Sequence, residues 1–329
     1  MNCPQDWPEP IVRVQSLSEG GLNTIPDRYI KPPMDRPKPT TSLVETDPCS
    51  DANIPIIDME GLYGDDCELR NSIVHQISEA SKEWGFFQVV RHGVPPELLD
   101  RAREVWRGFF HAPMEIKQAF ANSPKTYEGY GSRLGVDKVI DEYGRELVKL
   151  CGRLMKVLSI NLGLEEDYLQ NAFGGENIGA CLRVNFYPKC PQPDLTLGLS
   201  SHSDPGGMTL LLPDQHVYGL QVRKDNKWIT VKPAPHAFIV NIGDQIQVLS
   251  NAIYKSVEHR VIVNSDKERL SLAFFYNPKG DIPMEPAKEL VTADRPALYQ
   301  PMTFDEYRLF IRLRGPRGKT QVESLKSPR

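Results

Sequence analysis

Two hydrophobic periodicities divide the chain. Between about residues 68 and 162, apolar side chains recur at the spacing of an amphipathic helix, whereas from Ala180 onward they alternate with polar ones. A last segment, residues 303–314, returns to the helical spacing, with Thr303 as its N-cap and Gly315-Pro316 as its stop. The pattern predicts helices over residues 68–84, 95–110, 139–162 and 303–314.

Alternating positions predict a largely antiparallel β-structure. The expected strands are short, follow one another closely and are bounded by Gly, Pro, Asp or Asn, which is typical of a sandwich or barrel rather than of a parallel doubly wound sheet. They cover residues 54–58, 85–90, 181–187, 208–212, 219–223, 228–232, 238–241, 256–263 and 270–276.

Proline-rich sequence marks the N-terminal part of the chain. It excludes long helices there, so we expect an arm that lies over the core and is tethered by apolar side chains such as Trp7, Ile11 and Val14. The predicted organisation is an arm over residues 1–52, an α/β region over 53–138, a support helix over 139–179, and a barrel with its C-terminal helix over 180–329.

Composition and charge narrow the function classes. The chain has 329 residues, of which 40% are apolar and 25% charged, as in ordinary globular proteins. A net charge of −4 without basic runs argues against nucleic-acid and membrane-surface partners, and no apolar stretch reaches the ~18 residues of a membrane span. The N-terminus does not resemble a signal peptide, and six scattered cysteines favour reduced thiols. We expect a cytoplasmic protein, with the nucleus as a second candidate compartment; the oligomeric state stays open.

The candidate chemistry centres on a His-x-Asp pair and a distant histidine. On an extended chain His202 and Asp204 project to the same side, and His259, on a later antiparallel strand, can complete one face of an octahedron. Two imidazoles and one carboxylate leave three positions open, the arrangement of Fe(II) oxygenases, whereas a structural zinc site fills four positions and usually uses Cys. Taken alone, a His-x-Asp pair is more often a surface turn.

Two further pairs with the same spacing accompany the histidines. Arg269 and Ser271 place a guanidinium and a hydroxyl on one face of a strand, which suits bidentate capture of a carboxylate, although a salt bridge to neighbouring acidic side chains is the alternative. Asn185 and Tyr187 form the second pair on a strand expected to enter the same barrel.

These motifs together resemble the signature set of the plant 2-oxoglutarate- and Fe(II)-dependent dioxygenases. The motifs are His202-x-Asp204, His259, Arg269-x-Ser271, Asn185-Phe186-Tyr187-Pro188 and the run Gly85 to Gly93, in which the family usually has Asn where Arg91 stands. The similarity extends from Trp7 to Arg329. It implies a mainly β fold with flanking helices, built on a double-stranded β-helix (a jelly-roll, cupin-like core).

The resemblance also implies an enzyme and its cofactors. Fe(II) would be held by His202, Asp204 and His259, with no catalytic residue beyond these ligands, while 2-oxoglutarate and O2 serve as cosubstrates and ascorbate as a supporting reductant. The residues implied to bind 2-oxoglutarate are Arg269, Ser271, Asn185 and Tyr187.

Three segments resemble the jasmonate-induced oxygenases in particular: Trp7 to Leu17, Thr126 to Gly135, and the closing helix. That similarity implies hydroxylation of jasmonic acid to 12-hydroxyjasmonic acid, which lowers jasmonate signalling. The residues implied to bind the hormone are the arginines Arg183, Arg308 and Arg312, with Phe275 and Phe304 as apolar walls.

The charge pattern of the closing helix gives an independent hint. Arg308 and Arg312 are i, i+4 neighbours, and like charges so placed destabilise a helix unless an anion lies between them. Neutralisation by Asp305 or Glu306 is the alternative explanation.

One departure from the family concerns the substrate pocket. Members carry an additional segment, with an aromatic strand that lines the pocket, where Lys138 here runs directly into Val139. We therefore expect a chain that binds iron and 2-oxoglutarate but turns over the hormone slowly in an open, wet site.

Three other functions stay in consideration. A flavonoid-type oxygenase, similar to anthocyanidin or flavonol synthase, would share the chemistry but would not need the arginines. A catalytically impaired or non-catalytic barrel would only bind small molecules or partners. Zinc-dependent hydrolysis is disfavoured because no general base occupies a motif position.

Overall fold

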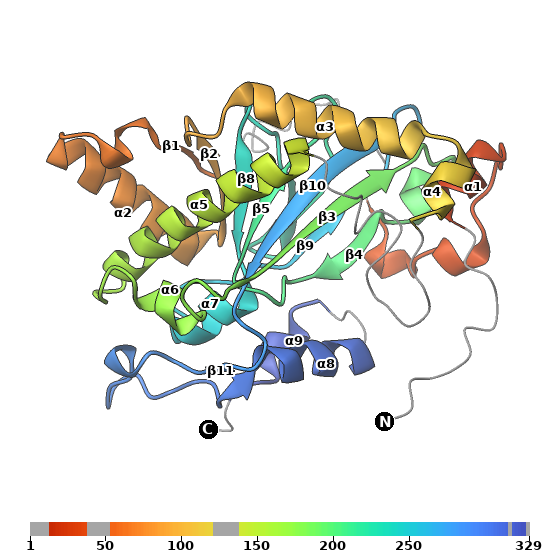
Figure 1. The fold of residues 1–329 in the computed structure, drawn as a ribbon. Coiled ribbons are helices and arrows are strands. Elements are labelled where there is room, and N and C mark those ends of the chain that lie inside the picture. Colours follow the sequence, from red (N-terminus) through yellow and green to blue (C-terminus); the bar gives the residue numbers. More distant parts are fainter. Residues whose placement is uncertain (1–12, 38–52, 121–137, 315–317, 327–329) are drawn as a thin grey trace.

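Two sheets that face each other form the centre of the molecule. The computed structural model describes residues 13–37, 53–120, 138–314 and 318–326. Within them, the main sheet has the strand order β1-β2-β8-β5-β10-β3 and the smaller sheet the order β4-β9-β6-β7 (Figure 1). All pairs are antiparallel except β1 with β2. The architecture confirms the predicted double-stranded β-helix with flanking helices.

The element bounds are as follows. The strands are β1 Ile56–Asp58, β2 Phe86–Val90, β3 Gly179–Tyr187, β4 Leu199–His202, β5 Met208–Leu212, β6 Leu220–Lys224, β7 Lys227–Thr230, β8 Phe238–Ile242, β9 His259–Val261, β10 Arg269–Asn277, β11 Pro283–Met284 and β12 Met302–Thr303. The α-helices are α1 Val14–Glu19, α2 Cys67–Glu83, α3 Pro96–His111, α4 Met114–Gln118, α5 Lys138–Asn161, α6 Tyr168–Ala172, α7 Asp244–Leu249, α8 Phe304–Arg314 and α9 Thr320–Glu323.

Helices α2, α3 and α5 cover the main sheet and bury their apolar stripes against it (Figure 1). The stripe of α5 is fully buried, and it joins the side chains of α3 and of β5, β8 and β10 in one continuous core. Helices α8 and α9 lie together beyond the end of the barrel next to α7 (Figure 1). One face of the main sheet is therefore sealed by helices, while the other faces the smaller sheet.

The strands and helices expected from the sequence are present, with two differences. Strand β9 is shorter than predicted, because the backbone before it turns back to hydrogen-bond with α7, where Ser256 N–H donates to Gln247 Oε1 at 2.9 Å. Val14 does not tether the arm, because its side chain is 51% exposed; instead Gln15 is buried and donates to the Phe110 carbonyl at 2.7 Å.

Helix α8 begins with the expected cap. Thr303 Oγ1 accepts from the Glu306 N–H at 3.2 Å, and Glu306 Oε2 accepts from the Thr303 N–H at 2.9 Å, which is a capping box. The expected stop at Gly315-Pro316, the tethers Trp7 and Ile11, and the motif Thr126 to Gly135 lie outside the described residues. The fourfold division of the chain stays a prediction.

The run from Gly85 to Gly93 builds β2 and its two ends. Gly85 has φ +60° and lies so close to the Lys255 carbonyl that a Cβ would overlap it. Arg91 adopts a left-handed φ of 49°, a conformation that Asn tolerates better, and its guanidinium is ion-paired with Asp58 and Glu60. The arginine that departs from the family pattern thus has a local electrostatic role at the sheet edge.

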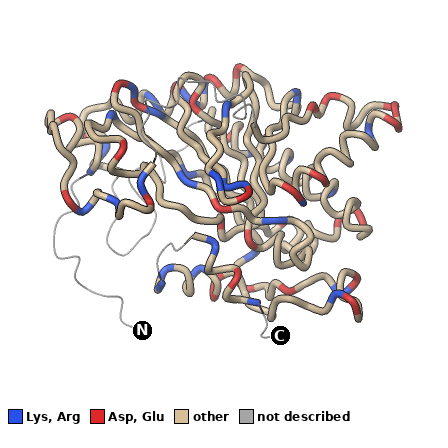
Figure 2. Tube along the Cα trace, turned by 180° about the vertical axis from the view of Figure 1, so that it is seen from behind, with Lys and Arg blue, Asp and Glu red and all other residues tan. Residues whose placement is uncertain are grey.

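Charges of both signs are interspersed along the described chain (Figure 2). In the part of the chain that the structure describes, no helix combines the length and the apolar character needed to span a bilayer.

Candidate metal centre and cosubstrate pocket

Three metal-ligating side chains converge between the two sheets. His202 ends β4, His259 begins β9, and the two are directly paired across these strands, with Asp204 just beyond β4. Asp204 Oδ1 lies 3.5 Å from His202 Nε2 and 3.6 Å from His259 Nε2. Among the described residues this is the one group of three such side chains whose ligand atoms all lie within 4.8 Å of one another.

Hydrogen bonds orient each of the three side chains. Nδ1 of His202 lies 2.8 Å from the Ser200 carbonyl, and Nδ1 of His259 lies 3.2 Å from the Val257 carbonyl. A carbonyl only accepts, so each Nδ1 carries the hydrogen and each Nε2 presents a lone pair to the centre.

Asp204 is fixed from its other side. Its Oδ2 accepts from Thr209 Oγ1 at 2.5 Å and from Asn241 Nδ2 at 2.8 Å, which leaves Oδ1 to face the histidines. One carboxylate oxygen and two imidazoles on one side of a point would leave the remaining positions of an octahedron for other ligands. Thr209 and Asn241 were not singled out from the sequence, although each is a polar residue inside an apolar strand.

The electrostatics of the centre favour a cation. Burial alone would raise the pKa of Asp204, but the charges and hydrogen bonds of His259 and His202 hold it well below its ordinary value. Burial, together with the charge of His202, lowers the pKa of His259 to about 4. Burial opposes protonation of His202 as well, but the hydrogen bond and charge of Asp204 raise its pKa. A divalent ion at this point would supply the positive charge that a proton on His202 otherwise supplies next to Asp204.

The loop after Asp204 is held by the start of α7. The backbone N–H groups of Gly243, Asp244 and Gln245 donate to the carbonyls of Gly207, Asp204 and Gly206 at 2.6, 2.8 and 2.9 Å. Asp244 is fully buried, and burial raises its pKa to about 6. The backbone of residues 203–207, called the metal loop below, is therefore held in place by the start of α7.

Strand β10 begins with a buried arginine that has no ion-pair partner among the described residues. Arg269 on β10 is 4% exposed, its Nη1 donates to Ser271 Oγ at 3.3 Å, and its Nε has no hydrogen-bond acceptor. Burial lowers its pKa, although the nearby Tyr187 and Asp214 oppose the shift. No carboxylate of the described residues lies within ion-pair distance of it, and the neighbouring Glu268 pairs with His111, so the salt bridge considered as the alternative is not formed.

The strand pairing places all four predicted cosubstrate residues together. Arg269 is the cross-strand partner of Tyr187, and Ser271 is the partner of Asn185. The guanidinium carbon of Arg269 lies 5.2 Å from the centre of the Tyr187 ring. A buried guanidinium with a hydroxyl beside it fits one carboxylate of a small diacid.

The residues predicted to bind a substrate form two separate pairs. Arg183 on β3 has its guanidinium carbon 6.0 Å from the Phe275 ring, and its charge is close enough to lower the pKa of His202. Arg308 on α8 lies 5.6 Å from the Phe304 ring and is also 3.8 Å from Asp305, the neutralising acid considered above. Arg312, one turn further along α8, is exposed.

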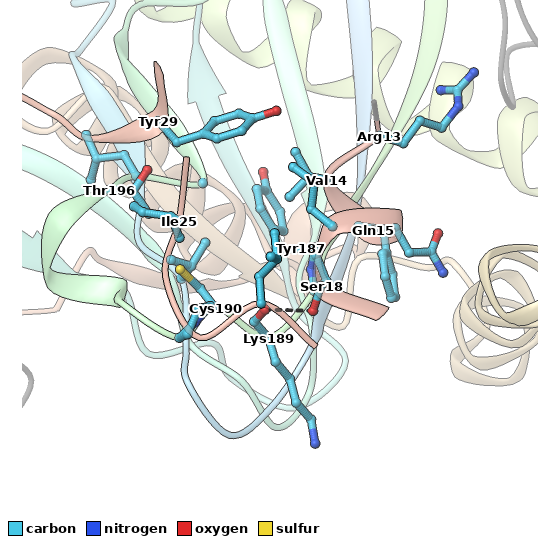
Figure 3. A pocket seen from close by; sticks show the side chains of 18 of the residues that line it. Arg13, Val14, Gln15, Ser18, Ile25, Tyr29, Tyr187, Lys189, Cys190 and Thr196 are labelled. Atoms are coloured by element: carbon cyan, nitrogen blue, oxygen red, sulfur yellow. Dashed lines mark hydrogen bonds between the residues drawn. The ribbon is translucent and has the colours of Figure 1, made fainter. Parts of the chain in front are cut away.

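A separate cavity of about 430 Å³ lies between the N-terminal residues and the end of β3 (Figure 3). Val14, Ile25 and Tyr29 line one side, and Tyr187 and Cys190 line the other. The cavity reaches Tyr187 and Asn185, two of the predicted cosubstrate residues, but none of the three converging ligands lines it.

Family models match two regions of the chain. Residues 54–144 match the "non-haem dioxygenase in morphine synthesis N-terminal" family, and residues 178–278 match the "2OG-Fe(II) oxygenase superfamily". Jasmonate-induced oxygenase 2 of Arabidopsis thaliana is 63% identical, with 98% of this chain and 95% of the relative covered. Flavanone 3-dioxygenase 2 of Oryza sativa subsp. japonica is 38% identical, with 89% and 92% covered.

Solved structures are similar as well. The crystal structure of JOX2 in complex with 2OG, Fe and JA superposes with a TM-score of 0.87 at 62% identity, covering 98% of this chain and all of that one. The rice dioxygenase for auxin oxidation, at 24% identity and a TM-score of 0.72, shows the shared fold. The alignment with jasmonate-induced oxygenase 3 extends over 365 residues, more than the 329 of this chain, so this relative has residues that the chain lacks.

Proposed function

This chain belongs to the 2OG-Fe(II) oxygenase superfamily, alongside the jasmonate-induced oxygenases, and from that premise we propose that it hydroxylates jasmonic acid with Fe(II), 2-oxoglutarate and O2. The observation that carries the proposal is the convergence of His202, Asp204 and His259 within 4.8 Å, with one carboxylate oxygen and two Nε2 atoms facing one point. A centre that offers ligands from one side only suits chemistry in which cosubstrates share the metal.

The proposed roles follow from this geometry. His202, Asp204 and His259 hold the iron, which when bound supplies O2 activation coupled to decarboxylation of 2-oxoglutarate to succinate and CO2. Arg269 and Ser271 bind the far carboxylate of 2-oxoglutarate, because within the described part of the chain the buried guanidinium has no carboxylate partner. The residues that position the rest of this cosubstrate are Asn185 and Tyr187.

The substrate is proposed to be held by its carboxylate. Arg183 lies near the metal centre, and Arg308 and Arg312 follow each other on one helix, so the three supply positive charge for an acid such as jasmonic acid. Phe275 and Phe304 supply apolar surface beside two of these arginines. The expected product is 12-hydroxyjasmonic acid, and we place the activity in the cytoplasm.

Binding tests separate this function from the alternatives. Anaerobic addition of Fe(II) and 2-oxoglutarate should produce a visible charge-transfer band, and its absence would remove the oxygenase assignment. Next, the double variant Arg308→Ala/Arg312→Ala should weaken binding of jasmonic acid at least tenfold, while binding of a neutral flavanone and of methyl jasmonate is unchanged. Arg314→Ala, on the same helix and stacked 4.2 Å from the Phe310 ring, is the matched control. Equal losses for the acid and the ester would refute carboxylate recognition.

We propose that the missing part of the pocket limits the rate at which jasmonic acid is hydroxylated. Jasmonate-induced oxygenase 3 carries additional residues, and we place the gap at the junction of Lys138 and Val139, where the family resemblance predicts it. Insertion of the segment from a jasmonate-induced oxygenase at this junction should raise turnover strongly without changing Fe(II) affinity. Equal rates for the two forms would show that the segment is dispensable.

A further inference from the structure

A chain of buried hydrogen bonds joins the metal loop to helix α8. Asp244 Oδ2 accepts from Tyr307 Oη at 2.7 Å and from Ser203 Oγ at 3.3 Å. Ser203 stands between two of the converging ligands, and the Asp244 N–H also donates to the carbonyl of Asp204 at 2.8 Å. One fully buried residue thus contacts the metal loop twice, through its carboxylate and its backbone N–H, and α8 once, through the same carboxylate.

The hydrogen bond of Tyr307 to Asp244 depends on the position of α8. Its side chain is 1% exposed and stacks on Phe310 of the same helix, with ring centroids 6.4 Å apart. Its neighbours Phe304 and Arg308 are residues that the proposed function assigns to the substrate. A displacement of the helix along its axis therefore cannot leave the Tyr307–Asp244 hydrogen bond unchanged.

We propose that Tyr307 and Asp244 are positioning residues that couple the substrate helix α8 to the metal centre. The coupling rests on the proposed function only in naming α8 as the substrate helix; the physical link stands on the hydrogen bonds alone. Filling the metal site fixes Ser203 and Asp204, and through Asp244 it holds Tyr307 and orders α8. By thermodynamic reciprocity, an acid that orders α8 strengthens metal binding by the same factor.

The link can be broken without removing a ring or a ligand. Tyr307→Phe deletes the hydroxyl and keeps the stacking of α8. Tyr254→Phe is a matched control, because Tyr254 is also fully buried and its hydroxyl donates a single hydrogen bond, to the Leu158 carbonyl at 3.0 Å, away from the metal loop. Both variants should lower the melting temperature similarly, so stability alone does not distinguish them.

The first measurement is hydrogen exchange of the full chain with and without Co(II). In the native sequence and in Tyr254→Phe, Co(II) should slow amide exchange within Phe304–Arg314 at least fivefold. In Tyr307→Phe the same addition should leave exchange in α8 within twofold of the metal-free rate, although Co(II) still binds. Unchanged exchange of α8 in the native sequence, or full protection in Tyr307→Phe, would overturn the proposal.

The second measurement tests reciprocity with jasmonic acid. Saturating jasmonic acid should tighten Co(II) binding at least fivefold in the native sequence and in Tyr254→Phe, but less than twofold in Tyr307→Phe. Equal tightening in Tyr307→Phe and the native sequence contradicts the coupling. Failure of jasmonic acid to bind any form refutes the proposed substrate instead, and the exchange measurement then decides on the link by itself.

Discussion

Removal of the charge of Arg269 should strongly weaken 2-oxoglutarate binding without destabilising the protein. In most cores, replacing a buried, hydrogen-bonded side chain costs stability. Here the guanidinium is 4% exposed, donates one 3.3 Å hydrogen bond to Ser271 and has no carboxylate partner among the described residues. Its desolvation is therefore largely uncompensated until an anion enters, and Arg269→Met should leave the melting temperature of the ligand-free protein unchanged or raise it.

The magnitude follows from the same contacts. A buried charge that loses its partner costs about 3–5 kcal/mol, and the carboxylate of 2-oxoglutarate recovers that energy on binding. Asp214 already offsets part of the charge of Arg269, so we use the lower end of this range. The offset is only partial, because the oxygens of Asp214 also accept from the Leu270 N–H and from Arg107. At about 1.4 kcal/mol per decade, Arg269→Met should weaken 2-oxoglutarate binding by a factor on the order of 100 or more.

Thermal unfolding with and without 2-oxoglutarate measures both effects. In the presence of Mn(II), ligand at about 100 times Kd should stabilise the native sequence by about 2.7 kcal/mol and Arg269→Met by almost nothing. Arg103 is the control, because it is equally buried but donates to Asp100 at 2.8 Å and to the Pro213 carbonyl at 3.3 Å. Arg103→Met should lower the ligand-free melting temperature and keep the stabilisation by 2-oxoglutarate. The reasoning fails if Arg269→Met unfolds several degrees earlier yet binds 2-oxoglutarate normally.

Three further predictions concern the scaffold. Gly85→Ala should destabilise the protein by about 1–3 kcal/mol in chemical denaturation, because φ is +60° and a Cβ would overlap the backbone. Gly108→Ala, in an open helical position, should instead stabilise it by roughly 0.5–1 kcal/mol. Equal effects of the two substitutions would contradict this reasoning. Thr209→Val or Asn241→Ala should weaken Co(II) binding about 10–100-fold, because each removes a hydrogen bond that orients the aspartate ligand, and unaltered affinity would exclude that role. Burial lowers the pKa of His92, so the stability that its neutral form contributes is complete above about pH 6.5 and is lost as the pH falls. His92→Gln should therefore flatten the acid-side slope of unfolding free energy against pH. An identical slope would assign the loss to other groups.

The sequence predicted the elements well because their signals are local. The stripe of α5 is set by residues close together in the chain and is buried as expected. Strand β10 is present as predicted, but its polar residues Arg269 and Ser271 are buried together with the apolar ones. The ligands were also predictable, because two of them share a strand end and the third follows a recognisable spacing. The supporting residues were not predicted. Thr209 and Asn241 contact Asp204 only through the register of β5 with β8, in which Thr209 is the direct partner of Asn241, and no single segment encodes that register.

Predictions based on exposure were weaker than those based on periodicity. Val14 is apolar yet half exposed, because the anchor of α1 is a side-chain amide hydrogen bond and not an apolar contact. Arg308 lies near Asp305, the acid considered as the alternative to a bound anion, and it also lies over the Phe304 ring, a contact that was not predicted. Side-chain positions on the outer face of a helix do not follow from its spacing. The partner that such a side chain contacts comes from another part of the chain, and the hydropathy pattern of its own segment carries no information on it.

The metal centre and the substrate wall depend on different parts of the sheet. The metal ligands are braced by β5, β8 and the start of α7, all of them interior to the fold. Arg183, in contrast, lies on β3, which within the described residues is one of the two edge strands of the main sheet, and its side chain is exposed. We therefore expect the shortened pocket to keep the braced metal ligands and the buried Arg269 in place while it loosens the hold on the acid. A site of this kind would consume 2-oxoglutarate faster than it hydroxylates jasmonic acid, because the hydrogen bonds that brace the metal ligands come from β5 and β8 and not from the strand that carries Arg183.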